Sequence, residues 1–147
     1  MPISTILADR IGHISLMASI RTVIVDDNAA IRKALRAVID GYRSLEVISE
    51  AANGEEAIRQ VQNLMPDLII MDISMPILDG LSAAEVVKRH RPETDILIFS
   101  THKIREFIES AKKIGLSGFV SKDEGGVGLL NAVNAILQHH PYFPTLS

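Results

Sequence analysis

The sequence contains no cysteine and no tryptophan, and aromatic residues make up only 4% of its 147 positions. Without cysteine the chain forms no disulfide, thiolate zinc site or iron–sulfur cluster, and thiol catalysis is excluded. The histidines lack the spacing of zinc ligands, so we interpret them as surface residues. No apolar run approaches the ~20 residues that a membrane-spanning helix requires. These absences favour a protein of the reducing cytoplasm that does not enter a membrane.

A strong excess of one charge is also missing. The net charge is -3, with 22% charged and 47% hydrophobic residues, which is an ordinary globular composition. The mild acidity argues against a nucleic-acid-binding surface over the whole chain. A length of 147 residues is enough for one domain with a full hydrophobic core.

The first 20 residues differ in pattern from the rest. Apolar residues recur at near-helical spacing between Ile3 and Ile14, and the charged residues among them argue against a signal peptide. Met17 stands just before the first strand-like segment and is an alternative start of the chain. We expect residues 1–20 to be an N-terminal extension, either a disordered arm or a short helix, followed by one domain over residues 21–140. Residues 141–147 are expected to be a C-terminal tail or a truncated linker.

From residue 21 onward, short apolar segments alternate five times with segments of helical periodicity. Asn53 is expected to cap the second helix, with Glu56 reaching back to it. Alternation with connections this short predicts an α/β fold, in which a parallel sheet carries helices on both faces. We expect strands at residues 22–25, 45–49, 68–71, 95–100 and 118–121, and helices near residues 31–39, 53–64, 82–90, 104–114 and 129–137.

Polar residues stand where four of these strands end. They are Asp26 and Asp27, Asp72, Ser100 and Lys122. Because parallel strands bring their carboxyl ends to one edge of the sheet, these side chains are expected to share one crevice. Three close carboxylates repel one another unless a cation joins them, and a hard divalent ion with oxygen ligands, Mg²⁺ first, fits best. A carboxylate beside such an ion and a lysine is able to attack a phosphorus atom.

These residues and their neighbours resemble the receiver domain of bacterial two-component response regulators. The resemblance covers residues 21–139, and it implies a flavodoxin-like (βα)5 three-layer sandwich with a parallel sheet in the order 2-1-3-4-5. The matching pieces are Asp26-Asp27, Asp72, Met75-Pro76, Asp79-Gly80, Ser100-Thr101 and Phe119-Val120-Ser121-Lys122.

The resemblance also implies a role for each matching residue. Asp72 is similar to the aspartate that accepts the phosphoryl group. Mg²⁺ would be held by Asp27, Asp72 and the backbone carbonyl of Ser74, with Asp26 acting through water. Met75, Pro76 and Gly80 match the family's loop after the phosphorylated aspartate.

Four further residues match the family's switch. Ser100 stands where the family has its switching hydroxyl, beside Thr101, and Lys122 matches the lysine that contacts the phosphoryl group. Phe119 matches the aromatic residue whose rotation follows phosphorylation. A new dianion at Asp72 would draw Ser100 and Lys122 inward, and the vacated space could admit Phe119.

Two features resemble the subgroup related to NarL and FixJ. Asp123 follows Lys122 where many family members have proline, and residues 138–144 resemble the subgroup's ending, which leads there into a DNA-binding domain. This sequence ends at Ser147. It is therefore a natural single-domain regulator, the receiver part of a longer protein, or a piece cut at the linker, and we expect no DNA binding by these residues.

We therefore predict a signalling receiver domain that accepts a phosphoryl group from a sensor histidine kinase or a phosphotransfer protein. It would catalyse only its own phosphorylation and dephosphorylation. The output surface is expected around the fourth helix, fifth strand and fifth helix, and a homodimer could form there or through the first and fifth helices.

Two alternatives use the same fold. One is a binding module that works without phosphorylation, against which the complete set of strand-end residues argues. The other is an aspartate-nucleophile phosphohydrolase, which needs a general acid two positions after Asp72, where Ser74 stands. The glycines at residues 125–128 do not form a dinucleotide fingerprint, and we interpret them as turn residues.

Overall fold

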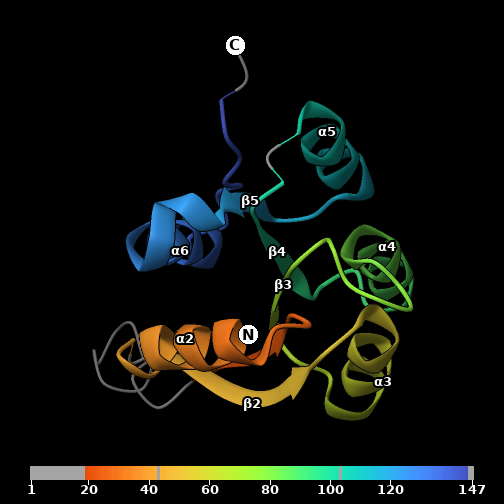
Figure 1. Ribbon diagram of the computed structural model, residues 1–147, viewed down its shortest axis with the longest axis horizontal. Helices are drawn as coiled ribbons and strands as arrows, with labels where there is room; N and C mark the ends of the chain where they lie inside the picture. The colour runs from red at the N-terminus through yellow and green to blue at the C-terminus, as the bar shows by residue number, and fades with distance from the viewer. Residues whose placement is uncertain (1–18, 43, 103, 146–147) are drawn as a thin grey trace.

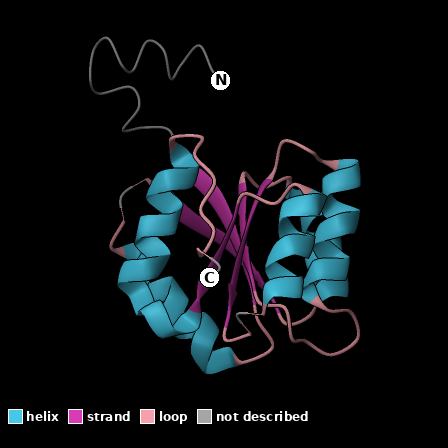
Figure 2. Cartoon of the chain, turned by 90° about the horizontal axis from the view of Figure 1, so that it is seen from above, coloured by secondary structure: helices cyan, strands magenta, loops and turns pink. Residues whose placement is uncertain are grey.

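The computed structural model describes residues 19–42, 44–102 and 104–145, so the expectations for residues 1–18 lie outside the described residues. A five-stranded parallel sheet in the order β2-β1-β3-β4-β5 forms the middle layer. Helices cover both of its faces, with α2 and α6 on one side and α3, α4 and α5 on the other (Figures 1 and 2). The predicted three-layer α/β fold and its strand order are confirmed.

The strands and helices alternate as predicted, with a short 3₁₀ turn added after the last strand. The strands are β1 (Ile20–Val25), β2 (Leu45–Ala51), β3 (Leu68–Met71), β4 (Asp95–Ser100) and β5 (Gly118–Ser121). The helices are α2 (Ala29–Asp40), α3 (Gly54–Leu64), α4 (Gly80–His90), α5 (Arg105–Ile114) and α6 (Gly125–Leu137), and the 3₁₀ turn η2 spans Lys122–Glu124.

Two apolar cores lie on opposite faces of the sheet. Side chains alternate between the faces of a strand, so Ile69 and Met71 join one core while Leu68 and Ile70 join the other. We call the core that contains Val87 and Ile108 the α3–α5 core, and the core that contains Leu35 and Val133 the α2–α6 core. Burial on both faces explains why the central strands read as unbroken apolar runs.

Side-chain caps set the starts of three helices. The side chain of Asn28 accepts hydrogen bonds from the first turn of α2, and that of Asn53 accepts one from the backbone N–H of Glu56. The predicted reach of Glu56 back to Asn53 is wrong by one residue, since its carboxylate accepts from the N–H of Ala52. Asp79 caps α4 by accepting from the N–H of Ser82, so α4 begins two residues earlier than expected.

Two predictions about glycines need correction. Gly80 is the first residue of α4, not part of the loop, because the side chain of Asp79 caps the helix just before it. Glycine fits this position because a Cβ would lie 1.9 Å from the carbonyl oxygen of Asp72. The glycines at 125–128 open helix α6 and do not form a separate turn. Gly125 has a φ of 64°, which lets the chain change direction between η2 and α6.

The segment after α6 runs back along β5 between α5 and α6 (Figure 1). Tyr142 forms an isolated parallel bridge with Gly118, beside the sheet edge. Among the described residues, no helix is long and apolar enough to cross a membrane.

Candidate phosphoacceptor site

Three aspartates meet at the carboxyl ends of neighbouring strands β1 and β3. Val25 and Met71 are partners in this parallel pair, so the residues that follow them, Asp26 and Asp72, are side by side. A carboxylate oxygen from each of Asp26, Asp27 and Asp72 lies within 4.8 Å of the others. Asp26 and Asp72 are buried, whereas Asp27 is exposed to solvent. The predicted convergence of the three carboxylates is therefore present.

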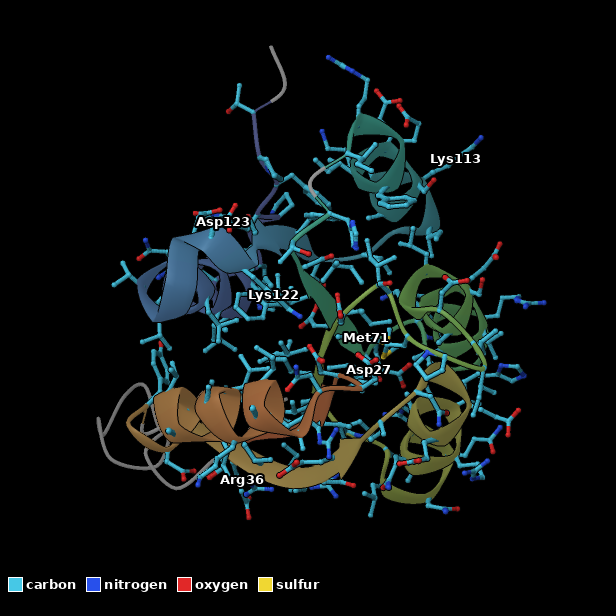
Figure 3. All side chains as sticks on the ribbon, in the orientation of Figure 1. Asp27, Arg36, Met71, Lys113, Lys122 and Asp123 are labelled. Carbon is cyan, nitrogen blue, oxygen red and sulfur yellow. The ribbon has the colours of Figure 1, made fainter. Side chains whose placement is uncertain are left out.

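Lys122 brings a positive charge to this cluster. Its Nζ lies 2.8 Å from Oδ2 of Asp26 and 3.3 Å from Oδ2 of Asp72. Partial burial works to lower the pKa of Lys122, but its hydrogen bond to Asp26 and the charge of Asp72 outweigh this and leave the pKa raised. Figure 3 shows Lys122 on the α6 side of the region that contains Asp27. The raised pKa favours the charged ammonium beside the carboxylates.

Asp26 is held by its neighbours on α2. Its Oδ1 accepts a hydrogen bond of 2.9 Å from the N–H of Asn28, and its carbonyl accepts one of 2.6 Å from Nη1 of Arg32. Arg32 in turn pairs with Glu50 on β2 at 3.0 Å, and Arg36 shares the same carboxylate. Arg32 and Glu50 were not predicted as site residues, because only their pairing across 18 residues reveals the link to the site.

Asp72 presents its two carboxylate oxygens differently. Oδ1 accepts a hydrogen bond of 2.8 Å from the N–H of Ile73, and Oδ2 faces the ammonium of Lys122. The backbone is fixed as well, since the N–H of Asp72 donates to the carbonyl of Val25 at 3.0 Å. The side chain is thus oriented by its own strand end and by the lysine together.

The loop after Asp72 follows a constrained path. Ser74 and Pro76 are exposed and Met75 is partly buried. The N–H of Leu78 donates to the carbonyl of Pro76 across Ile77, which has a φ of 70° and is 73% exposed. A β-branched residue in this γ-turn is strained, and such strain persists only where surrounding contacts impose it. The contacts here are the hydrogen bonds from Gly54 to Leu78 and from Gly80 to Ile73.

The predicted switch residues lie one and two strands away from Asp72. Ser100 ends β4 and is fully buried, and its Oγ accepts a hydrogen bond of 3.0 Å from the N–H of His102. Thr101 is exposed. Phe119, on β5, is fully buried in the α3–α5 core.

A groove beside the site opens toward solvent. It measures ≈ 440 Å³ and lies between the loop after β3, with Ile73, Ser74 and Met75, and the loop after β4, with His102 and Ile104. The ring of His102 packs edge-on against Phe107, with 6.4 Å between the ring centroids. The groove therefore gives a small molecule or a partner side chain room to approach the cluster next to Ser74.

A cluster of three aspartates with a bound lysine, at the carboxyl edge of a 2-1-3-4-5 sheet, defines a receiver-type α/β protein. Comparison with known families agrees, because the family model described as the response regulator receiver domain matches residues 22–134. This chain belongs to the response regulator receiver domain family, as predicted. A receiver domain is a phosphorylation-activated signalling module.

Solved structures support the predicted subgroup. The chain superposes on a LuxR-family two-component response regulator from Aurantimonas sp. SI85-9A1 with a TM-score of 0.81 and 30% identity, covering 85% of this chain and 89% of that one. It superposes on the signal receiver domain of the response regulator NarL from Mycobacterium tuberculosis with a TM-score of 0.77 and 26% identity, covering 82% and 98%.

Curated relatives include larger proteins with different names. A protein-glutamate methylesterase/protein-glutamine glutaminase from Carboxydothermus hydrogenoformans is 42% identical over 114 residues, which is 77% of this chain and 32% of the relative. The transcriptional regulatory protein DegU from Brevibacillus brevis is 29% identical over 84% of this chain and 52% of its own length. The chain thus spans about a third to a half of these relatives, and their enzymatic or regulatory names describe longer proteins.

Proposed function

We propose that this receiver accepts a phosphoryl group on Asp72 from the phosphohistidine of a sensor histidine kinase or a phosphotransfer protein. The observation that carries the proposal is the contact of 3.3 Å between Lys122 Nζ and Oδ2 of Asp72, next to two further aspartates. Such kinases present their phosphohistidine in the cytoplasm, where we place the reaction.

The donor set fits Mg²⁺. Carboxylate oxygens from Asp26, Asp27 and Asp72 lie within 4.8 Å of one another, and hard oxygen ligands are those that this ion prefers. Asp26 already uses Oδ2 for Lys122, which supports contact through water, whereas Asp27 is exposed and free to bind directly. We assign the remaining protein ligand to the carbonyl of Ser74, two residues beyond Asp72. The bound ion would supply positive charge to the phosphoryl oxygens.

Asp72 and Lys122 have separate roles in the phosphoryl transfer. A carboxylate oxygen of Asp72 attacks phosphorus, an O–P bond forms, and the P–N bond to the donor imidazole breaks as the imidazole leaves. Lys122 pairs with the new phosphoryl oxygens, because its raised pKa keeps it charged. The loop through Met75 and Pro76, which leads to Gly80 at the start of α4, would border the approach to Asp72.

The switch follows from the new charge. The hydroxyl of Ser100 would turn toward the phosphoryl group, and the backbone N–H of His102 would lose its present acceptor. Thr101, next to it, would move with this loop. Because Phe119 is already fully buried, we expect phosphorylation to hold its ring in place rather than to bring it in from solvent. The changed surface would be read by an output partner or by a second copy of the chain at α5, β5 and α6.

The test is the intact mass of the protein after incubation with acetyl phosphate or phosphoramidate, with and without Mg²⁺. We expect the wild type to gain one phosphoryl group only with Mg²⁺. Asp72→Asn should gain none, and Asp40→Asn, which changes an exposed aspartate at the end of α2, should behave as wild type. A folded wild type that gains nothing would overturn the proposal and favour a binding module that works without phosphorylation.

A further inference from the structure

The outer edge of β5 is covered by the chain's own C-terminal segment. β5 is the last strand of the sheet, and an edge strand leaves a row of unpaired backbone groups. Here the N–H of Phe119 donates to the carbonyl of Tyr142 at 2.7 Å, and the N–H of Tyr142 donates to the carbonyl of Ser117 at 3.1 Å. Tyr142 therefore pairs with the edge of β5 through one isolated bridge, and we call residues 141–145 the edge segment.

Two neighbouring aromatic side chains of the edge segment pack on opposite faces of the sheet. Tyr142 contacts the α2–α6 core and Phe143 contacts the α3–α5 core. The ammonium of Lys112 lies 5.4 Å from the centre of the Phe143 ring, a cation–π contact. The alternation is that of a strand, so the segment is docked by side chains as well as by backbone hydrogen bonds.

The edge segment also contacts the turn that carries Lys122. The hydroxyl of Tyr142 donates to Oε1 of Glu124 at 3.4 Å, and Oε2 of Glu124 accepts from the N–H of Ser121 at 3.4 Å. Ser121 and Glu124 form the capping box of η2, whose first residue is Lys122. Burial, together with the charge of Glu124, raises the pKa of Tyr142, so its hydroxyl keeps the proton that it donates.

We propose that the outer edge of β5 is an intramolecular docking surface for residues 141–145, and that phosphorylation of Asp72 weakens this docking. The inference rests on the proposed function of Asp72. The backbone of Tyr142 bonds Phe119 on β5, and its hydroxyl bonds Glu124 in the η2 turn. The edge segment is therefore linked both to the sheet and to the turn that carries Lys122.

The direction of the effect follows from the geometry. Lys122 now bonds both Asp26 and Asp72, and a phosphoryl group on Asp72 would draw its ammonium toward the new phosphoryl oxygens. In the proposed coupling, part of this movement passes to the η2 turn, which Gly125, with its positive φ, joins to α6. The bonds of Glu124 to Tyr142 and Ser121 are both at 3.4 Å, near the limit for a hydrogen bond, so a small shift breaks them.

The consequence is an exposed strand edge in the phosphorylated state. Release of Tyr142 and Phe143 would uncover backbone groups of β5 and apolar surface on both cores, in the region between α5 and α6. The edge of β5 would thus be covered by the edge segment before phosphorylation and exposed to solvent after it.

The test is hydrogen exchange of the Phe119 amide, measured by NMR with and without beryllofluoride, a phosphoryl mimic, in the presence of Mg²⁺. We expect beryllofluoride to speed exchange of this amide about 10-fold, while the amide of Val23 in central strand β1 stays slow. Fluorine NMR of the same sample reports whether beryllofluoride is bound. Bound beryllofluoride with unchanged exchange at Phe119 would overturn the coupling.

Three variants separate docking from coupling. In the protein without beryllofluoride, Phe143→Ala should speed exchange of the Phe119 amide, and Thr145→Ala, an exposed position in the same segment, should not. Equal exchange in the two variants would overturn the docking. Tyr142→Phe, which removes only the hydroxyl that reaches Glu124, should keep exchange slow and reduce the response to beryllofluoride.

Affinity gives a reciprocal readout. Since coupling between two sites is mutual, Phe143→Ala should bind beryllofluoride more tightly by about the factor by which beryllofluoride loosens the segment. A protein that binds no beryllofluoride at all would overturn the proposed function and the coupling with it. The docking itself would still be decided by the comparison of Phe143→Ala with Thr145→Ala.

Discussion

Lys122 reaches from the end of β5 to Asp26 at the end of β1, although β3 and β4 lie between these strands in the sheet. The 2.8 Å contact joins residues 96 positions apart and holds the ammonium above the end of β3, where Asp72 stands. One side chain thus spans the site and neutralises part of its negative charge. Its removal should affect both stability and chemistry.

Lys122→Met should lower the free energy of unfolding by about 1–3 kcal/mol, because the buried carboxylate of Asp26 loses its charged hydrogen-bond donor. Urea unfolding at neutral pH measures the change. Lys113→Met is the matched control, since Lys113 lies exposed on α5, far from the cluster (Figure 3), and should change stability by less than about 0.5 kcal/mol. Equal losses in the two variants would contradict the structural role of the contact.

Mg²⁺ should raise the melting temperature of the wild type, and a chelator should reverse the rise, because an ion that binds only the folded state stabilises it. Asp27→Asn should need at least about 10-fold more Mg²⁺ for the same shift, since loss of charge at an exposed direct ligand weakens the site. Thermal unfolding over a Mg²⁺ series gives both curves. Asp123→Asn, an exposed aspartate outside the cluster, serves as the control, and superimposed curves for the two variants would remove Asp27 from the ligand set.

Gly80→Ala should destabilise the fold by about 3 kcal/mol or more, because its Cβ would lie 1.9 Å from the carbonyl oxygen of Asp72 and backbone must move. The same shift should slow phosphorylation by displacing Asp72. Gly41→Ala is the control, since Gly41 has a φ of -81° and, among the described residues, its Cβ would meet only the carbonyl of Val38, at 3.5 Å. Denaturant unfolding measures both losses, and equal losses in Gly80→Ala and Gly41→Ala would contradict this prediction.

Protonation of Glu50 at low pH should weaken its ion pairs with Arg32 and Arg36, the first of which also bonds the carbonyl of Asp26. Hydrogen bonds from Arg36 and Arg32 outweigh the opposing effect of burial and hold the pKa of Glu50 below its ordinary value of 4.5. A lowered pKa in the folded state means that Glu50 adds stability above pH 4.5, which is lost as the pH falls through the folded-state pKa.

Unfolding free energies of wild type and Glu50→Gln should therefore differ by a constant amount well above pH 4.5, and the difference should shrink as the pH falls below 4.5 and vanish below the folded-state pKa of Glu50. The difference is expected to be modest because Glu50 is partly exposed. A difference that grows toward acid would show that the two arginines do not stabilise the charged carboxylate.

Much of the fold follows from local chemistry. Unbroken apolar runs such as Leu68–Met71 are buried on both faces, and the caps at Asn28 and Asn53 act within their own turns. Parallel strands bring their carboxyl ends together, so the meeting of Asp26, Asp27 and Asp72 was predictable from where the strands stop. The sequence by itself therefore determined the layers, the strand positions and the acidic cluster.

Only the tertiary structure decided which residues far apart in the sequence come into contact. Three such contacts leave no periodic signal in the chain. They are the bond of Lys122 to Asp26 past two intervening strands, the pairing of Arg32 with Glu50, and the docking of Tyr142 on β5. Gly80 was predicted in the loop, but α4 begins there after the Asp79 cap, and only the packed structure shows how close it lies to Asp72. Local patterns report which face of an element is buried, whereas such contacts arise only when the packed sheet brings separate elements within reach of one another.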